Sequence, residues 1–393
     1  MNNKLKVRGQ DLYEVVFRFV WLMTAMYFLI RPILNNSSLT RAIWVPSILL
    51  IVIASLRTNL EKIEILSLVV TGVILLFSMI SQEKANSEEH FLAAFCYLGM
   101  IVVLIKCSSI EPSKKTFDFI FYVCVFLSVL FIIYSFTSIA HSYELYGIKR
   151  VTSYFVFNLG NSNTASMFLY SFLCVLLINI PYRKHKWFII FLIVWDLYLI
   201  YGTNSRSTLA ATLIVIVACV FFSKKKLSKA VILICVFFPI IFAAIYLYMF
   251  YIAGYANFII MDKTLFSGRQ VGYIKYLSML ESTVNYLFGN FAESRFQNAE
   301  NAPIAILSSI GMFGVVTFYS FFLHLLFKIN TSSTTQMRNI CIICILGIFV
   351  ESSTEASFFL GGFPGIIMMS SFFLLGNYSD PDESIDEGKG SSS

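Results

Sequence analysis

Charged residues are scarce in this sequence. Asp, Glu, Lys and Arg make up 13% of the chain, against about 25% in an average soluble domain. Hydrophobic residues make up 58% of its 393 positions, and the mean hydropathy is +0.77. A chain with so few charges cannot present a polar surface to water on all sides. The composition therefore excludes an ordinary soluble protein and indicates that lipid surrounds most of the chain.

The sequence also lacks the signatures of several enzyme classes. It contains no P-loop, no GxGxxG after a predicted strand and no GxSxG. The four histidines are single and widely spaced, so neither a metal site nor a cofactor is predicted. None of the eight cysteines falls in a predicted outer loop, so no disulfide framework follows. Cys341 and Cys344 form a CxxC inside an apolar run, where small helix residues are a simpler interpretation than zinc or redox chemistry.

Apolar runs of membrane-helix length recur along the chain. A helix needs about 20 mainly apolar residues to cross the hydrocarbon core. The first run begins near Tyr13 and is too long for a signal peptide, so we interpret it as a true first span. The sequence predicts an all-α, polytopic membrane helix bundle of about twelve transmembrane helices. The predicted spans are 11–33, 42–56, 63–80, 90–106, 116–139, 161–181, 187–202, 207–222, 230–250, 303–327, 339–352 and 358–376.

Basic residues alternate between the two sets of loops. The set that begins with the N-terminal segment carries about twice as many Lys and Arg residues as the other set. The positive-inside rule places the richer set, and both termini, in the cytoplasm. The net charge of +7 arises from this bias and does not indicate a nucleic-acid partner.

The chain is predicted to have one membrane domain and one tail. Residues 1–376 form a single transmembrane domain with one large outer loop at about 251–302, a size typical of functional loops. Within that loop, apolar residues recur at steps of three or four from Val271 to Leu287. This spacing predicts a short amphipathic helix that ends at Gly289. The acidic segment 377–393 is predicted to be a disordered cytoplasmic tail.

Four polar segments fall on the predicted outer side. They are GNSNTASMF with Asn163, YGTNSRSTLAA with Arg206, SGRQVGYIKYL with Arg269, and ENAPIAILSSIGMFG with Glu300 and Asn301. Positive charge on this side opposes the topological bias, so each outer arginine is expected to have a specific structural or functional role. A guanidinium near the headgroups can hold a phosphate or pyrophosphate through two hydrogen bonds. Alternatively, Arg206 extends to the surface or pairs with a carboxylate.

Carboxylates accompany these arginines. Glu300, ahead of the span 303–327, can accept a proton from an attacking sugar hydroxyl. It can equally be a carboxylate that stabilises a helix N-terminus. Glu351 and Glu355 are further carboxylates on the outer side. Asp196 lies inside a predicted span, where it is either a functional group or the partner of an arginine in the first span.

In their order and sidedness, the four segments resemble the O-antigen polymerase and ligase superfamily, which includes the Wzy polymerases of O-antigen and capsule. The resemblance covers about residues 155–376. Such proteins have a similar number of spans and one large late outer loop. The residues that match their motifs are Asn163, Ser205, Arg206, Ser267, Gly268, Arg269, Glu300, Asn301 and Gly311. Glu300 stands where ligases commonly have a histidine, which favours a polymerase over a ligase.

The resemblance implies a metal-independent glycosyltransferase without a cofactor in the bacterial cytoplasmic (inner) membrane. It would join undecaprenyl-pyrophosphate-linked glycans, one as donor and one as acceptor, and release the lipid pyrophosphate. A direct displacement would invert the anomeric centre. The predicted catalytic residues are Glu300, Arg206 and Arg269, and the predicted substrate-binding residues are Asn163, Asn301, Ser205, Ser267 and Tyr273. Further candidate partners are membrane lipids and a chain-length regulator and flippase of the same pathway. The alternatives are a ligase-type oligosaccharide transferase and a polysaccharide or lipid transporter.

Overall fold

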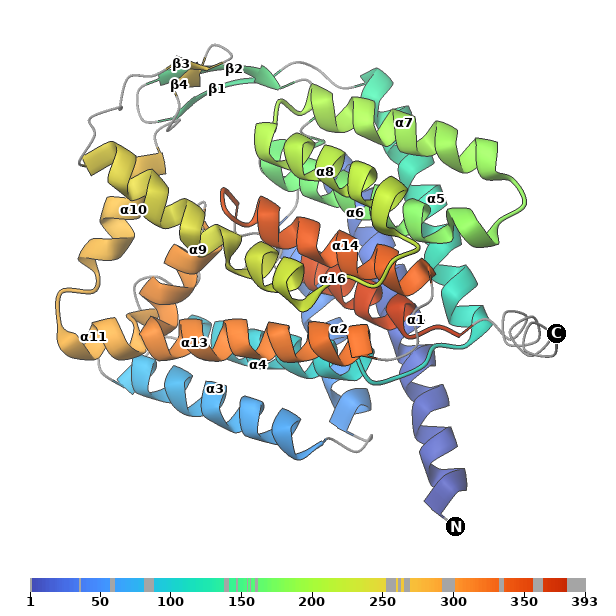
Figure 1. Cartoon of the computed structure of the whole chain (residues 1–393), viewed down its shortest axis with the longest axis horizontal. Coiled ribbons are helices and arrows are strands. Elements are labelled where there is room, and N and C mark those ends of the chain that lie inside the picture. The colour runs from blue at the N-terminus through green and yellow to red at the C-terminus, as the bar shows by residue number, and fades with distance from the viewer. Residues whose placement is uncertain are drawn as a thin grey trace.

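The computed structural model shows a bundle of helices (Figure 1). It describes residues 2–34, 37–56, 61–80, 88–137, 141–145, 148–153, 155, 157–159, 162–251, 259–260, 263–264, 269–291, 301–331, 336–355 and 363–379. The helices are α1 (Asn2–Leu34), α2 (Ser37–Leu56), α3 (Lys62–Ile80), α4 (Glu88–Cys107), α5 (Lys114–Thr137), α6 (Ser162–Asn179), α7 (Lys186–Gly202), α8 (Arg206–Phe222), α9 (Lys229–Tyr251), α10 (Arg269–Ser278), α11 (Thr283–Phe288), α13 (Ala302–Thr331), α14 (Gln336–Glu351) and α16 (Phe363–Gly376). A 3-10 turn, η1 (Ile180–Tyr182), follows α6. Two antiparallel hairpins pair β1 (His141–Leu145) with β2 (Ile148–Ser153) and β3 (Ile259–Ile260) with β4 (Lys263–Thr264).

Each of the twelve ranges predicted as a span overlaps a helix, although residues 138–139, 161 and 358–362 of these ranges lie outside the described chain. Among the described residues, five helices are long and apolar enough to cross a membrane. These are Gln10–Ile33, Lys114–Thr137, Ser162–Tyr182, Lys229–Met249 and Ala302–Thr331. The chain is therefore a helical membrane protein. The number of twelve crossings and the identity of the membrane stay predictions, and the predicted tail lies outside the described residues from position 380 onward.

Helices α6 and α14 lie in the centre of the bundle. In the most apolar stretch of Ser162–Tyr182, 83% of the residues are buried, against 28% in that of Lys229–Met249 of α9. Nearly all residues of α14 are buried as well. Gly347 of α14 permits this packing, because a Cβ there would overlap the hydroxyl of Tyr170 in α6. That hydroxyl donates a hydrogen bond to the carbonyl of Cys344 at 2.6 Å. A small residue thus lets two membrane helices approach closely.

Large apolar side chains cover the outward faces of α7, α8 and α9. Trp187, Val220 and Phe221 are 84%, 73% and 67% exposed. Soluble monomers rarely expose contiguous apolar surface of this kind. These faces therefore suit contact with lipid chains, as the composition predicts.

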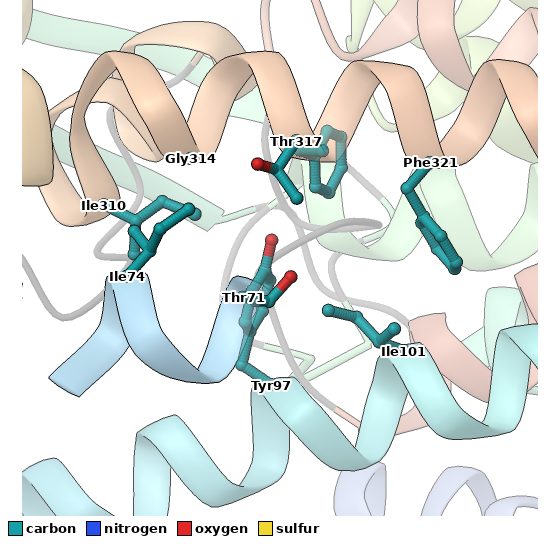
Figure 2. Close-up of a pocket in the computed structure, with 9 residues that line it drawn as sticks. Thr71, Ile74, Tyr97, Ile101, Ile310, Gly314, Thr317 and Phe321 are labelled. Atoms are coloured by element: carbon teal, nitrogen blue, oxygen red, sulfur yellow. The ribbon is translucent and has the colours of Figure 1, made fainter. Parts of the chain in front are cut away.

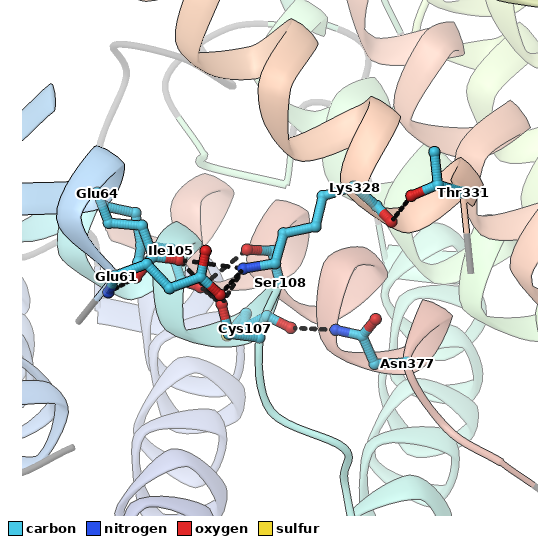
Figure 3. Close-up of polar contacts among 9 residues, drawn as sticks. Glu61, Glu64, Ile105, Cys107, Ser108, Lys328, Thr331 and Asn377 are labelled. Carbon is cyan, nitrogen blue, oxygen red and sulfur yellow. Dashed lines mark hydrogen bonds and ion pairs between the residues drawn. The ribbon is translucent and has the colours of Figure 1, made fainter. Parts of the chain in front are cut away.

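Lys328 joins three helix ends at one end of the bundle (Figure 3). Its ammonium lies 2.8 Å from Glu61 Oε1 and 3.3 Å from Glu64 Oε1, at the start of α3. It also donates a hydrogen bond to Ser109 Oγ, just after α4, at 3.1 Å. The hydrogen bond from Lys328 lowers the pKa of the Glu61 carboxyl. The pair is therefore charged at neutral pH and ties α13 to α3 and α4.

Further polar contacts join the other helix ends on this side. The Glu14 carboxylate of α1 accepts hydrogen bonds from Ser113 and Thr116 at the start of α5. Arg183, after α6, lies 2.7 Å from Asp118 of α5. Other contacts at this end join Asn330 to Leu227, Asn339 to Ser223 and Asn377 to Cys107. The described parts of the segments that the charge pattern groups as cytoplasmic thus lie together at one end, while the side of the membrane they face stays a prediction.

The prediction of one continuous amphipathic helix in the large loop was wrong. The segment forms two helices, α10 and α11, because Ser282 starts a new one. The Ser282 hydroxyl accepts a hydrogen bond from the backbone N–H of Asn285 at 3.0 Å, which caps α11. The predicted end at Gly289 is confirmed, with φ of 81°.

Helix α11 packs across α13 through two glycines. Gly289 has φ 81° and ψ −178°, and Gly311 has φ 69° and ψ −170°. Glycine alone adopts this backbone region readily. A Cβ on Gly311 would overlap the backbone of Leu287, and a Cβ on Gly289 would overlap that of Ser309. The kink of α13 at Gly311 therefore provides the seat for α11.

A small gap remains where α3, α4 and α13 meet. Figure 2 shows Thr71, Tyr97 and Thr317 facing it from the three helices, with Ile74 and Phe321 among the apolar residues around it. Its volume is about 10 Å³, roughly the space that one water molecule requires. A gap of this size is too small for a sugar or a lipid.

Gly311→Ala is expected to destabilise the protein. The backbone strain alone costs about 1–3 kcal/mol, and overlap with Leu287 adds to it. Gly72→Ala in α3 is the matched control, because a Cβ there meets nothing within 4 Å and alanine favours a helix. In detergent, the purified Gly311 variant should melt several degrees below wild type, and the control should not. Equal melting temperatures for the two variants would contradict a strained kink.

Candidate functional site

Two buried glutamates lie at the end of the bundle opposite Lys328. Helix α14 ends with Glu351, and Glu355 follows after one turn. Each residue is 1% exposed. The N-terminal ends of α6, α8 and α13 contact this segment. Four segments distant in sequence therefore meet at the two carboxylates.

Thr208, in the first turn of α8, connects three of these helices. Its hydroxyl donates a hydrogen bond to Glu351 Oε1 at 3.2 Å. It accepts one from Ser166 of α6 at 2.9 Å and lies 3.0 Å from Ser205 Oγ. The second carboxylate oxygen, Glu351 Oε2, has no hydrogen-bond partner among the residues described. Among the described residues, a hydrogen bond therefore holds only one of the two carboxylate oxygens of Glu351.

Asn163 contacts the second glutamate. Its Nδ2 donates a hydrogen bond to Glu355 Oε2 at 2.8 Å. Asn163 is the second residue of α6, and Thr208 is the third of α8.

Asn301 has a structural role in this arrangement. Its Oδ1 accepts a hydrogen bond from the backbone N–H of Ile304 at 3.0 Å, which caps α13. Its Nδ2 donates a hydrogen bond to the carbonyl of Ser353 at 2.8 Å. The side chain is fully buried. Both ends of the amide are engaged within the protein, so Asn301 positions the Glu351–Glu355 turn instead of presenting its amide to a sugar.

The two predicted arginines begin helices that lead to the cluster. Arg206 is the first residue of α8, and a turn precedes it in which Asn204 has φ of 59°. Asparagine is enriched in this left-handed region. Arg269 is the first residue of α10. Convergence of both guanidiniums on one pyrophosphate stays a prediction.

The other predicted residues lie apart from this cluster or outside the described chain. Tyr273 is fully buried and packs against Tyr246 of α9, with ring centroids 5.3 Å apart. It is therefore unavailable to a substrate in this conformation. Glu300 and Ser267 lie outside the described residues. Asp196, deep in α7, accepts a hydrogen bond from Ser128 of α5 at 2.8 Å.

Thr208 was not predicted from the sequence, and Glu351 and Glu355 were predicted only as further carboxylates on the outer side. The run of hydroxyl and amide side chains from Thr203 to Thr208 was the available signal. Motif matching emphasised Arg206 within that run. The structure shows that the hydroxyl two residues later makes the contact between helices.

An aromatic groove lies beside the cluster. It has a volume of about 500 Å³, and its lining consists of Ser135, Phe136, Phe155, Val194, Trp195 and Tyr198. Phe155 packs on Gly202, the last residue of α7, where a Cβ would overlap its ring. Three residues further along the chain, Ser205 reaches Thr208. An apolar groove next to a polar cluster suits an amphiphile with a long apolar chain.

The chain matches no protein family, no curated protein and no solved structure. Its site is therefore interpreted from its own chemistry. That chemistry combines two buried carboxylates, arginines at the starts of two helices, and an adjoining apolar groove. This arrangement is suited to an anionic amphiphile and to proton exchange at the carboxylates.

Thr208→Val should weaken the junction of α6, α8 and α14. Valine keeps the shape but removes the hydrogen bond to Glu351, a kind of bond worth about 1.5–3 kcal/mol. Thr212→Val is the matched control, because this buried hydroxyl one turn later bonds to the carbonyl of Thr208 within the same helix. The Thr208 variant should have the lower melting temperature in detergent. If Thr212→Val melts at or below the melting temperature of Thr208→Val, Thr208 does not form the junction.

Proposed function

We propose that this protein is a polysaccharide polymerase that joins lipid-linked oligosaccharide repeat units. The observation that carries the proposal is the meeting of three separate segments at one polar cluster. Asn163 of α6 and Ser205 before α8 enter the hydrogen-bond network of the glutamates at the end of α14. These are residues through which the sequence resembles the O-antigen polymerases and ligases. The reaction takes place at the outer face of a bacterial cytoplasmic membrane.

The donor in this proposal is an undecaprenyl-pyrophosphate-linked glycan. Arg206 and Arg269 hold the pyrophosphate and stabilise the charge that develops as it leaves. The aromatic groove beside α7 takes part of the apolar chain. Because pyrophosphate is already a good leaving group, most of the acceleration comes from orienting the two glycans. A chain-length regulator and a flippase of the same pathway are the expected protein partners.

The chemical step is a direct displacement. A hydroxyl of the acceptor glycan attacks the anomeric carbon of the donor's reducing-end sugar, and the bond to the pyrophosphate oxygen breaks. The anomeric centre is inverted, and the hydroxyl proton passes to a base, for which Glu300 is the candidate. Asn163 and Ser205 position the sugars in this proposal.

Arg206→Ala and Arg269→Ala should abolish polymer formation. Deleting the gene should leave surface glycans of a single repeat, and the wild-type gene should restore long chains. Each arginine variant should fail to restore them at matched membrane levels, since one lost charge-stabilising contact costs about 10²–10³ in rate. Lys275→Ala, which removes an exposed positively charged side chain of α10, is the matched control and should restore full-length polymer.

The glycan profile of the deletion strain also separates the alternatives. Unattached long chains would identify a ligase, and loss of all outer-face glycan would identify a flippase. Full-length polymer from both arginine variants would rule out the proposed pyrophosphate site.

Glu300→Gln should fold normally but lose most of its turnover. Glutamine keeps the size and much of the hydrogen bonding of glutamate, whereas it cannot accept the hydroxyl proton. General-base help is worth about a hundredfold or more. The measurement is the polymerisation rate of the purified variant on lipid-linked repeats. A rate within about threefold of wild type would exclude Glu300 as the base.

A further inference from the structure

Four exposed lysines border the contact between the start of α5 and the segment that joins α6 to α7. In this contact, Arg183 lies 2.7 Å from Asp118 of α5. The ring of Tyr182 meets that of Phe117 edge-on, with ring centroids 6.2 Å apart. The joining segment therefore lies on the first turns of α5. Two lysines precede the contact on α5 and two follow it in the joining segment, and we call the four together the basic rim: Lys114, Lys115, Lys184 and Lys186.

The basic rim carries positive charge without a counter-charge. All four lysines are exposed, and none forms an ion pair with a described residue. The acid nearest to them along α5, Asp118, is already paired with Arg183. Glu111 is the other acid in the segments 111–118 and 182–187, which together contain five Lys and Arg residues. The basic rim therefore favours a ligand with net negative charge.

An exposed apolar face of α7 begins directly beside the basic rim. Trp187, which follows Lys186, is 84% exposed. Phe191, Val194 and Tyr198 follow at steps of three or four residues and are exposed as well, so the four side chains share one face of the helix. Tryptophan is enriched at the level of the lipid headgroups. The basic rim thus lies at headgroup level, next to a surface suited to acyl chains.

We propose that the basic rim binds the headgroup of an anionic phospholipid whose acyl chains lie along this face of α7. Lysine ammonium groups bind phosphate as compact charges, and basic sites at the ends of membrane helices bind anionic headgroups. A zwitterionic phospholipid carries a positive group of its own, which the four lysines repel. The proposal goes beyond the polymerase function, because it requires neither a glycan nor the arginines that begin α8 and α10.

Quenching of Trp187 fluorescence by brominated lipids tests the proposal. The full-length protein is reconstituted in phosphatidylcholine vesicles that contain, at equal mole fraction, either brominated phosphatidylglycerol or brominated phosphatidylcholine. The difference between wild type and Trp187→Phe isolates the signal of this residue. One lysine near an anionic surface favours binding by about fivefold, so brominated phosphatidylglycerol should occupy the position at least about fivefold better.

Changing all four lysines of the basic rim to glutamine should remove this preference, because glutamine carries no charge. Lys184→Gln/Lys186→Gln, confined to the exposed joining segment, should weaken it and serves if the fourfold variant does not fold. The matched control is Lys224→Gln/Lys225→Gln/Lys226→Gln, which removes three exposed lysines from the loop after α8. The control should keep the preference of wild type.

Equal quenching of wild type by the two brominated lipids would overturn the proposal. A preference that both rim variants keep, or that the control loses as well, would also overturn it, because the lipid would then respond to charge elsewhere on the protein. Loss of the preference on adding inorganic phosphate at constant ionic strength would identify a site for free phosphate instead. A preference that appears only after deletion of residues 380–393 would identify the acidic tail as the occupant. None of these outcomes bears on the polymerase, which the glycan profile tests separately.

Discussion

The burial of two carboxylates at the end of α14 is the constraint on which one end of this bundle depends. A carboxylate in a poorly solvated interior needs donors and nearby positive charge. The N-terminal turns of α6 and α8 supply hydrogen-bond donors through Asn163 and Thr208. Asn301 adds a third link by binding the turn between the glutamates. Removing the carboxylates would leave the ends of α6 and α8 without these hydrogen-bond acceptors, whereas Asn301 would keep its bond to the backbone.

The rest of the bundle separates polar contacts from apolar packing. Lys328 and the residues around it join helix ends at the opposite side through ion pairs and hydrogen bonds. Between the two ends, α14 packs against α6 and α8 with small residues such as Gly347. A membrane helix gains little from burying apolar surface against another helix, so close packing and end contacts determine the arrangement. The buried glutamates lie at the end opposite these ion pairs.

The large loop is attached to this end at a defined point. Gly289 and Gly311 bring α11 into backbone contact with the kink of α13. The same helix α13 begins at Asn301, beside the glutamates. Helix α10, which starts with Arg269, precedes α11 in the chain. The glycine contact thus fixes α11, the helix that follows α10 in the chain, against α13.

Local composition by itself determined much of this protein. Apolar runs located the long helices, and charge bias grouped the loops whose described parts the structure places together, because both are properties of short stretches of chain. Only the tertiary structure decided that Asn163 meets Glu355, 192 positions away, and that Thr208 meets Glu351, 143 positions away. It also decided that Asn301 caps a helix and that Tyr273 is buried. Such pairings depend on which helix ends pack together in three dimensions, and no local pattern of residue types encodes that choice.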